Sequence, residues 1–348
     1  MMYKRSRSHH WRKVGGATGK AALLFRNKPR GCLPVKLPVA GAVALREMLM
    51  KIWINNKIVD DKDAKVSVFD RGFLYGDGVF ETMRSYNGVV FKLDEHLDRL
   101  FNSLKIVKIK IPYSKSLLKK QIYKLLKINR LNDAYIRITA TRGTGAVGLA
   151  KIDCVIPTIV IIVKKFTPYS PKMYKNGVSA KIVNCRQNEN SPVSRIKSIS
   201  FLNYILARLE AKENGFDDAI MLNSKGAISE ATISNVFLVK GKRLITPPLK
   251  SGILPGITRR IILKLAAKAG LKPKEEIVTP KAFYNADEVF LTNSLMEVMP
   301  VVKVDNRIIG KGNPGVFTRR IHLEYKKRTN DKFLARNDFS RLSLTADV

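Results

Sequence analysis

Residues that build metal sites and disulfide frameworks are scarce in this sequence. Its 348 residues include only three cysteines and four histidines. The cysteines, Cys32, Cys154 and Cys185, are odd in number and far apart, and none belongs to a C-x-x-C pair of the kind that binds zinc or exchanges thiols. This usage excludes a disulfide scaffold and is typical of a reducing compartment, so we expect a cytoplasmic protein.

The sequence also lacks the patterns of metal hydrolases and membrane proteins. No two histidines have the spacing of metal ligands on one helix face, so no metal is expected. No apolar run approaches the roughly 20 residues that a membrane span requires. We therefore expect a soluble protein with no membrane partner.

Acidic residues are few compared with basic ones. The chain holds 64 Lys and Arg against 28 Asp and Glu, a formal charge of +36. Such a surplus fits a polyanionic partner, a phosphate-bearing ligand or a solvated basic surface, and composition leaves the three open. Because 45% of the residues are hydrophobic, we expect a globular chain of about two domains with packed cores.

The first 49 residues differ from the rest of the chain. Eleven of them are Lys or Arg and only Glu47 is acidic, which leaves a charge of +10. This composition is typical of segments that do not fold. We expect residues 1–49 to be a disordered tail or an over-extended gene start, and a basic targeting or nucleic-acid-binding arm is the alternative.

Hydrophobic patterning predicts a small α/β domain over residues 50–167. Asn55-Asn56 and Asn87-Gly88 are typical of the tight turns of β-hairpins. Residues 93–106 and 116–127 have the apolar spacing of helices.

A larger domain follows a short linker. Two prolines in residues 166–171 end the preceding apolar strand, and we place the linker at 168–176. A β-rich domain is expected over 177–328, and a tail over 329–348. Its predicted helices are 198–213 and 257–269, and its predicted strands are 178–183, 219–222, 227–228, 236–239, 243–246 and 288–291.

Two ionisable residues of the second domain could carry chemistry. Lys197 precedes an apolar helix pattern, and the nearby Arg195 together with partial burial would lower its pKa and make it a nucleophile toward an aldehyde or ketone. Glu230 lies between apolar strand segments, where a carboxylate needs a partner. On these residues alone, a solvated lysine and a structural ion pair are the simpler interpretations.

Three further segments have the chemistry of an anion site. Pro255 and Gly256 precede a predicted helix, whose N-terminus presents unpaired N–H groups, and Thr258 adds a hydroxyl. Thr292-Asn-Ser294 is a small polar cluster at a strand end. Arg99 is a cation on a predicted helix, and a solvent-facing arginine is the alternative there.

The order and spacing of these signals resemble those of the class IV aminotransferases, which are fold-type IV pyridoxal-phosphate enzymes. This family includes branched-chain aminotransferases, D-amino acid aminotransferases and aminodeoxychorismate lyases. The resemblance implies an α/β (α+β) two-domain fold, with pyridoxal 5'-phosphate in the cleft between a small α/β domain and a larger β-rich one. It covers about residues 51–328 and rests on six motifs, FDRGFLYGDGVFE (69–81), EHLDRL (95–100), RIK (195–197), ISEAT with NVF (228–237), LPGITR (254–259) and LTNSLME (291–297).

The resemblance implies roles for individual residues. Lys197 corresponds to the lysine that forms the Schiff base with the cofactor and moves the proton at the substrate α-carbon. Glu230 corresponds to the carboxylate that keeps the pyridine nitrogen protonated. Tyr204 lies near the position of the tyrosine beside the cofactor's ring oxygen, but two residues further from the lysine than in branched-chain enzymes. The phosphate-binding positions correspond to Arg99, Ile257, Thr258 and Ser294.

The resemblance also implies a substrate pocket and a homodimer or higher oligomer. Tyr75, Phe80, Arg84, Arg137 and Leu295 correspond to substrate-side residues of branched-chain aminotransferases. The implied reaction is transfer of an amino group from a branched-chain L-amino acid to 2-oxoglutarate.

Two related activities and one unrelated one are the alternatives. The loop over residues 141–149 resembles that of aminodeoxychorismate lyases and lacks the Arg-x-His pair of D-amino acid aminotransferases. A nucleic-acid-binding protein would explain the basic first 49 residues but not the six motifs, and the remaining charge of +26 is spread along the chain. Nucleic acid is therefore not an expected partner.

Overall fold

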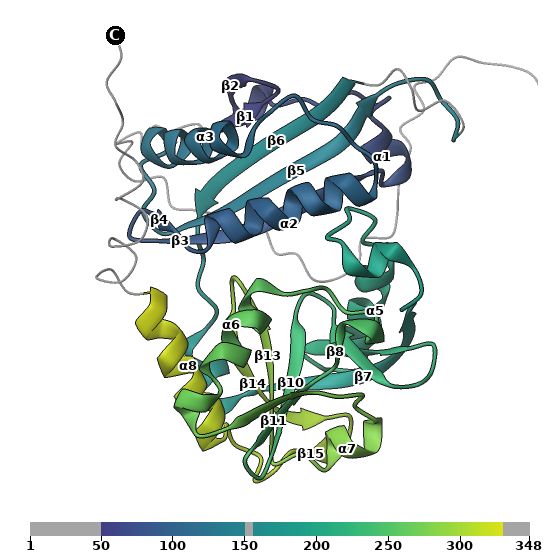
Figure 1. The fold of residues 1–348 in the computed structure, drawn as a ribbon, viewed down its shortest axis with the longest axis vertical. Helices are drawn as coiled ribbons and strands as arrows, with labels where there is room; N and C mark the ends of the chain where they lie inside the picture. The colour runs from purple at the N-terminus through teal and green to yellow at the C-terminus, as the bar shows by residue number, and fades with distance from the viewer. Residues whose placement is uncertain (1–49, 150–155, 330–348) are drawn as a thin grey trace, which may run out of the picture. The chain divides into compact units, whose positions relative to one another are not determined.

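The computed structural model describes residues 50–149 and 156–329. The predicted N-terminal segment, the last residues of the predicted tail, Cys32 and Cys154 lie outside this range. The described residues form helices and two β-sheets, one of six strands and one of nine. The mixed α/β class predicted from the sequence is confirmed (Figure 1).

The first sheet is antiparallel, with strand order β2-β1-β6-β5-β3-β4. Both predicted hairpin turns are present, because Asn55, Asn56, Asn87 and Gly88 all adopt the positive φ that these turns require. The strands are β1 (Lys51–Ile54), β2 (Lys57–Asp60), β3 (Gly78–Tyr86), β4 (Val89–Val90), β5 (Ala134–Thr144) and β6 (Ile156–Lys165).

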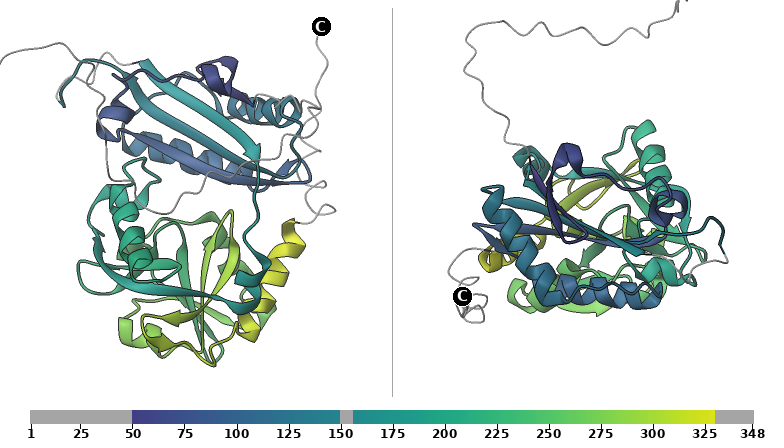
Figure 2. Two further views of the ribbon diagram at one scale, coloured as in Figure 1. Left: turned by 180° about the vertical axis from the view of Figure 1, so that it is seen from behind. Right: turned by 90° about the horizontal axis from the view of Figure 1, so that it is seen from above.

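Among residues 50–149, three α-helices accompany this sheet, namely α1 (Arg71–Tyr75), α2 (Leu93–Ile106) and α3 (Lys115–Ile128). The leucines that predicted α2 recur at three-to-four spacing and are buried, as is the apolar stripe of α3. These stripes pack with Trp53, Met83 and Ile136 in one core. Seen from behind in Figure 2, the strands lie in front of α2.

The second sheet mixes parallel and antiparallel pairs, in the order β12-β11-β10-β13-β14-β7-β8-β9, with β15 beside β14. Its strands are β7 (Val178–Gln187), β8 (Asp218–Asn223), β9 (Ile228–Ala231), β10 (Asn235–Lys240), β11 (Arg243–Thr246), β12 (Lys272–Glu275), β13 (Glu288–Asn293), β14 (Glu297–Val304) and β15 (Arg307–Ile308). The helices of this part are α4 (Pro171–Asn176), α5 (Leu202–Glu213), α6 (Ile257–Leu265), α7 (Pro280–Tyr284) and α8 (Val316–Thr329).

Two differences from the predicted elements matter. Strand β12 was not predicted, because its four residues are all exposed and it pairs only with β11, so it shows no apolar pattern. The helix expected from residue 198 begins at Leu202 instead. Ser198 forms an isolated antiparallel bridge with Val79, and its neighbours bond to the start of β3, through Phe80 N–H to the Lys197 carbonyl (2.8 Å) and Ile199 N–H to the Gly78 carbonyl (3.1 Å). This pairing places Lys197 beside β3.

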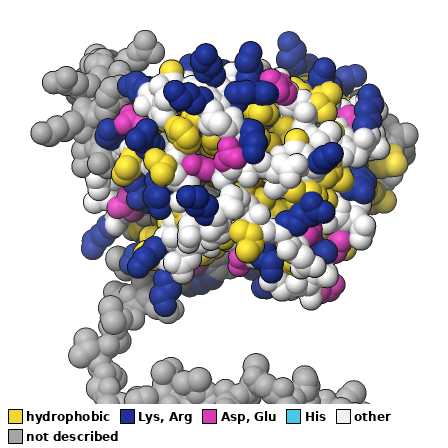
Figure 3. All heavy atoms as spheres, turned by 90° about the horizontal axis from the view of Figure 1, so that it is seen from below, with side chains coloured by type: hydrophobic (Ala, Val, Ile, Leu, Met, Phe, Trp, Pro, Cys, Tyr) yellow, Lys and Arg dark blue, Asp and Glu magenta, His cyan; other side chains and the backbone are white. Residues whose placement is uncertain are grey.

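The basic side chains do not form a single stripe on the face drawn in Figure 3, where Lys and Arg are spread among neutral and apolar side chains. No helix in the described part of the chain has the length and hydropathy of a membrane span.

Candidate active site

A cavity of about 220 Å³ contains most of the predicted site residues. Its walls come from β3, β5 and α2 of the first sheet's part of the chain, and from the segment before α5, the first turn of α6 and the turn after β13. The lining residues are Phe80, Thr82, Arg99, Tyr135, Arg137, Lys197, Phe201, Ile233, Asn235, Leu254, Gly256, Ile257, Thr258, Thr292, Asn293, Ser294 and Leu295.

Lys197 presents an amine that forms no ion pair with any described carboxylate. Its Nζ lies 4.7 Å from the centre of the Phe80 ring. Burial lowers the pKa of Lys197 to about 8, and the nearby Arg99 acts in the same direction. A minority of the side chain is therefore neutral near pH 7 and about half near pH 8, and the neutral amine is the state that a nucleophile or general base needs.

Glu230 is a buried carboxylate on β9 that is held by neutral donors. Its Oε2 accepts bonds from the Leu254 N–H (3.0 Å) and from Asn235 Nδ2 (3.2 Å). Its Oε1 accepts a bond from the Tyr204 hydroxyl (3.3 Å). Burial raises the pKa of Glu230 to about 7, although these bonds and Lys197 favour its ionised form.

Arg99 is oriented by a buried acid that sequence reasoning missed. Its Nε and Nη2 donate to the two carboxylate oxygens of Glu81 at 2.6 and 2.8 Å, and its Nη1 donates to the Pro255 carbonyl at 3.1 Å. His96 Nδ1 contacts Glu81 Oε2 at 2.7 Å, and His96 Nε2 lies 3.3 Å from Ser294 Oγ. Burial would raise the pKa of Glu81, but Arg99 and His96 hold it at about 2.

The first turn of α6 is the second cationic feature of the cavity. Gly256 is its N-cap residue, so no side chain caps the helix. A Cβ atom on Gly256 would lie 1.9 Å from Asn235 Oδ1, so only glycine fits there. The uncapped N–H groups and the positive end of the helix dipole favour an anion at this end of the cavity.

Three of the five predicted substrate residues line the cavity, namely Phe80, Arg137 and Leu295. The Arg137 guanidinium lies over the Phe80 ring, 3.8 Å from its centre, and its Nε donates to Thr139 Oγ1 at 3.0 Å. No described carboxylate pairs with Arg137, so its charge remains available to a ligand. The neighbouring wall is apolar, because Phe201, Ile233 and Leu295 all contribute to it.

Arg84 does not line this cavity. Its Nη1 donates to Glu297 Oε1 at 3.1 Å, and its guanidinium lies 3.9 Å from the centre of the Phe166 ring. Glu297 also accepts a bond from the Tyr86 hydroxyl (2.9 Å) and contacts His322 Nε2 (2.8 Å). The arginine therefore joins β3 to the beginning of β14.

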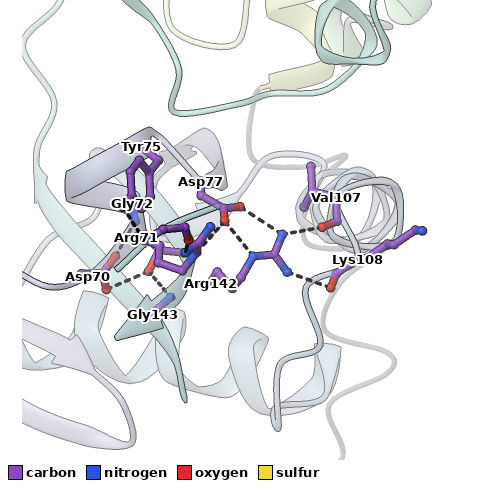
Figure 4. Close-up of polar contacts among 11 residues, drawn as sticks. Asp70, Arg71, Gly72, Tyr75, Asp77, Val107, Lys108, Arg142 and Gly143 are labelled. Carbon is purple, nitrogen blue, oxygen red and sulfur yellow. Dashed lines mark hydrogen bonds and ion pairs between the residues drawn. The ribbon is translucent and has the colours of Figure 1, made fainter. Parts of the chain in front are cut away.

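Tyr75 also lies outside the cavity lining. It is the last residue of α1, and its hydroxyl accepts a bond from the Gly148 N–H at 3.0 Å. Figure 4 shows the neighbouring polar contacts, in which Asp77 bonds to both Arg71 (3.2 Å) and Arg142 (2.7 Å). These ion pairs tie α1 to the end of β5 and so hold Tyr75 in place.

Tyr204 joins the site through Glu230. Besides donating to that carboxylate, its oxygen accepts a bond from Gln187 Nε2 at 2.6 Å. Nothing in the sequence around Gln187 pointed to this contact. Glu81, by contrast, was detectable as an acid within an apolar strand pattern, where burial demands a partner.

Comparison with known proteins identifies the family. The class IV amino-transferase family model matches residues 78–304. A relative from Methanocaldococcus jannaschii, provisionally named a branched-chain-amino-acid aminotransferase, is 43% identical over 278 residues, which cover 80% of this chain and 96% of the relative. The aminodeoxychorismate lyase of Bacillus subtilis is 37% identical over 278 residues, or 79% of this chain and 94% of the lyase.

Solved structures have the same fold. The branched-chain amino acid aminotransferase from Thermobaculum terrenum, solved in its PLP form, has a TM-score of 0.75 at 27% identity, and the match covers 82% of this chain and 96% of that one. The expected fold-type IV architecture is confirmed, and so is the expected cofactor. This chain belongs to the class IV aminotransferase family, whose enzymes use pyridoxal 5'-phosphate as their cofactor.

Proposed function

We propose that this enzyme transfers the amino group of a branched-chain L-amino acid to 2-oxoglutarate, and that Lys197 is the residue that bonds covalently to the cofactor. The observation that carries the proposal is the position of Arg137. It is a cation without a carboxylate partner among the described residues, set among apolar walls in the same cavity as Lys197. Such a pocket suits both an apolar side chain and a dicarboxylate.

The side chains of the cavity fit pyridoxal 5'-phosphate. Arg99 has five N–H donors, of which three make the bonds described above, so two remain for a phosphate. The uncapped start of α6 and the hydroxyl of Ser294 lie in the same cavity and suit the same anion. Glu230 lines an adjoining hollow of about 50 Å³ that also contains Lys197, and it would be the acid for a ring nitrogen, while Lys197 would be the amine for an aldehyde. When bound, the cofactor supplies an electron sink for the carbanion formed at the substrate α-carbon.

The protein's own groups then orient the substrate and move its proton. Lys197 Nζ is the base that removes the α-proton and the acid that returns it, because its lowered pKa allows both states near neutral pH. The Leu254 N–H and the Asn235 amide donate to Glu230 and hold it in place, so its carboxylate keeps its position during the reaction. The apolar walls keep water away from the reacting atoms.

Arg137 is the proposed carboxylate receptor. Its guanidinium lies over Phe80 and is tethered to Thr139, so a carboxylate can approach its free edge and form charge-assisted hydrogen bonds. Replacing it with Met keeps the stem but removes the charge. We expect Arg137→Met to raise the KM for 2-oxoglutarate by about 10- to 100-fold, and we expect Arg137→Lys to recover part of this loss.

A related lyase is the second candidate, since the Bacillus subtilis aminodeoxychorismate lyase is 37% identical to this chain. A lyase needs no 2-oxo acid acceptor, whereas a transaminase does. The test is a panel of L-leucine, L-isoleucine, L-valine, D-alanine and aminodeoxychorismate, each with and without 2-oxoglutarate or pyruvate. Acceptor-dependent turnover of the branched-chain L-amino acids supports the proposal. Acceptor-independent turnover of aminodeoxychorismate, or preferred turnover of D-alanine, contradicts it.

We also propose that the enzyme works as a cytoplasmic homodimer or higher oligomer. Large apolar side chains are exposed near Tyr75, and Phe73 is 74% exposed while Leu149 is 77% exposed. A second copy covering this surface would remove these side chains from water. Sedimentation at moderate salt tests the proposal, and a fully active monomer would contradict it.

A further inference from the structure

A chain of three polar side chains leads from the second sheet to the carboxylate beside the cofactor cavity. Gln187 ends β7 and is buried, Tyr204 lies on α5, and Glu230 lies on β9. Gln187 Nε2 lies 2.6 Å from the Tyr204 oxygen, which lies 3.3 Å from Glu230 Oε1. The three residues come from separate elements, so only the folded chain brings them together.

The bond from Gln187 fixes the direction of the tyrosine proton. An amide nitrogen only donates, so the Tyr204 oxygen is the acceptor in that bond. The single phenolic proton must then point elsewhere, and Glu230 Oε1 is the acceptor that the described residues provide. Consecutive bonds of this kind polarise one another, so Gln187 strengthens the bond to Glu230.

Tyr204 is the only described side chain that bonds to Glu230 Oε1. The other oxygen, Oε2, is held by Leu254 and Asn235. The charged groups that face Glu230 are Lys197 and Arg99, and both favour its ionised form. Burial acts in the opposite direction and raises the pKa of Glu230.

Tyr204 is set apart from the main cavity. Like Glu230, it is absent from the residues that line the 220 Å³ cavity, and both line a smaller hollow of about 50 Å³ that has Lys197 and Asn235 in common with the cavity. The single phenolic proton is directed at the Glu230 carboxylate, which leaves Tyr204 no proton to donate to the cofactor.

We infer that Tyr204, oriented by Gln187, is a positioning residue that holds Glu230 ionised and correctly aimed, and that it does not bind the cofactor directly. The inference rests on the proposed function in taking Glu230 as the partner of the cofactor ring. It assigns Tyr204 a role different from the ring-oxygen contact that the family resemblance implies.

The decisive variant is Tyr204→Phe in the holoenzyme, because it removes one hydroxyl and keeps the ring. Without the bond, the pKa of Glu230, raised by burial to about 7, rises by about one further unit. We expect the acidic limb of the kcat profile to move upward by about one pH unit, with kcat about tenfold lower within that limb and nearly unchanged on the plateau above it. The affinity for pyridoxal phosphate should change by less than about threefold.

The other outcomes overturn the inference. A loss of kcat that is equal at all pH values would indicate general loosening of the pocket. An unmoved acidic limb with a large loss of cofactor affinity would indicate direct contact between Tyr204 and the cofactor. Circular dichroism verifies that the variant is folded.

Gln187 provides a matched pair of variants. Gln187→Glu replaces the donor with an acceptor, which draws the tyrosine proton away from Glu230, so the acidic limb should move at least as far as in Tyr204→Phe. Gln187→Leu only removes the donor, so its shift should be smaller. Equal profiles for both Gln187 variants and the wild type would contradict the role of Gln187.

An infrared measurement separates this inference from the proposed function. The carboxyl stretch of Glu230, assigned by its loss in Glu230→Gln, can be followed through a pH titration of the full chain freed of cofactor. We expect its midpoint to rise in Tyr204→Phe even if the substrate panel shows no transamination. An unchanged midpoint would overturn the inference even if transamination is found.

Discussion

At the scale of single residues, the environment of each ionisable group decides what it can do. Lys197 is half-buried and Glu230 is buried in the same site, and this loss of hydration lowers the pKa of the lysine to about 8 and raises that of the acid to about 7. Each group therefore changes its protonation state near neutral pH, where an isolated lysine and glutamate would both stay charged.

Replacing the lysine tests its assignment. We expect Lys197→Ala to lower turnover by about 10²- to 10⁴-fold or more, because no other described amine lines the cavity. Borohydride reduction of the loaded enzyme, followed by peptide mass mapping, should label Lys197 in the wild type and nothing in the variant. The exposed Lys225 offers a control, since Lys225→Ala should keep both the label and turnover. A label on another lysine in the wild type would disprove the assignment.

Glu81 links the site to acid stability. Its pKa is lowered from 4.5 to about 2, so its ionised form stabilises the fold fully above pH 4.5, and this contribution is lost as the pH falls toward 2. The contribution is about 3 kcal/mol. We expect Glu81→Gln to lose at least this much stability at pH 7 in urea unfolding, and to show a flatter stability profile between pH 4.5 and 2.

A matched control for this effect is the exposed Glu213. Glu213→Gln should leave the profile of the wild type unchanged, because its carboxylate is solvated. If Glu81→Gln and the wild type lose stability in parallel below pH 4.5, another carboxylate is responsible for the acid dependence.

At the scale of elements, the ion pair between Arg84 and Glu297 connects β3 with β14 across 213 residues of sequence. Both side chains are largely buried, and Tyr86 and His322 complete the bonding of the carboxylate. The turn that precedes Glu297 carries Ser294 and Leu295 into the cavity. The ion pair therefore stabilises one wall of the cavity, although neither of its side chains lines the cavity.

Breaking this pair should cost stability rather than substrate affinity. Arg84→Met removes one of the two basic partners of the buried Glu297 and leaves His322, so we expect a loss of about 1–3 kcal/mol in denaturant unfolding. A double-mutant cycle with Glu297→Gln should show strong coupling. Because Arg84 is outside the cavity, the KM values for both substrates should change little at a temperature where the variant is folded. A selective rise in KM would instead support direct binding of substrate by Arg84.

At the scale of the whole molecule, the composition break near Met50 separates a strongly basic segment from the catalytic chain. The class IV match over residues 78–304 and the cavity lining both lie beyond this break. We expect a chain that begins at Met48 to keep its melting temperature and its kcat within about twofold, because no residue of the site is removed. Insoluble or inactive protein would show that the fold requires residues 1–47. Loss of nucleic-acid binding alone, with activity intact, would support the basic-arm interpretation.

Much of this protein was predictable because its signals are local. Hairpin turns follow from Asn-Asn and Asn-Gly pairs, and amphipathic helices follow from apolar spacing, since both depend on neighbouring residues alone. The ordered motifs around Lys197 and Glu230 likewise led to the family and its cofactor. Strand β12 could not be predicted in this way, because its exposed residues become a strand only by pairing with β11.

The partners of the buried charges were decided by tertiary structure. The predicted helix began at residue 198, but Ser198 instead forms a β-bridge with Val79, because β3 offers this segment backbone partners some 120 residues earlier in the chain. Arg84 was predicted to face the substrate but pairs with Glu297, and Tyr204 bonds to Glu230. In both cases a distant element places the partner within reach. Sequence determines which residues must be buried and which chemistry they bring, whereas a buried charge or hydroxyl bonds to whichever group the packing of distant elements places within reach.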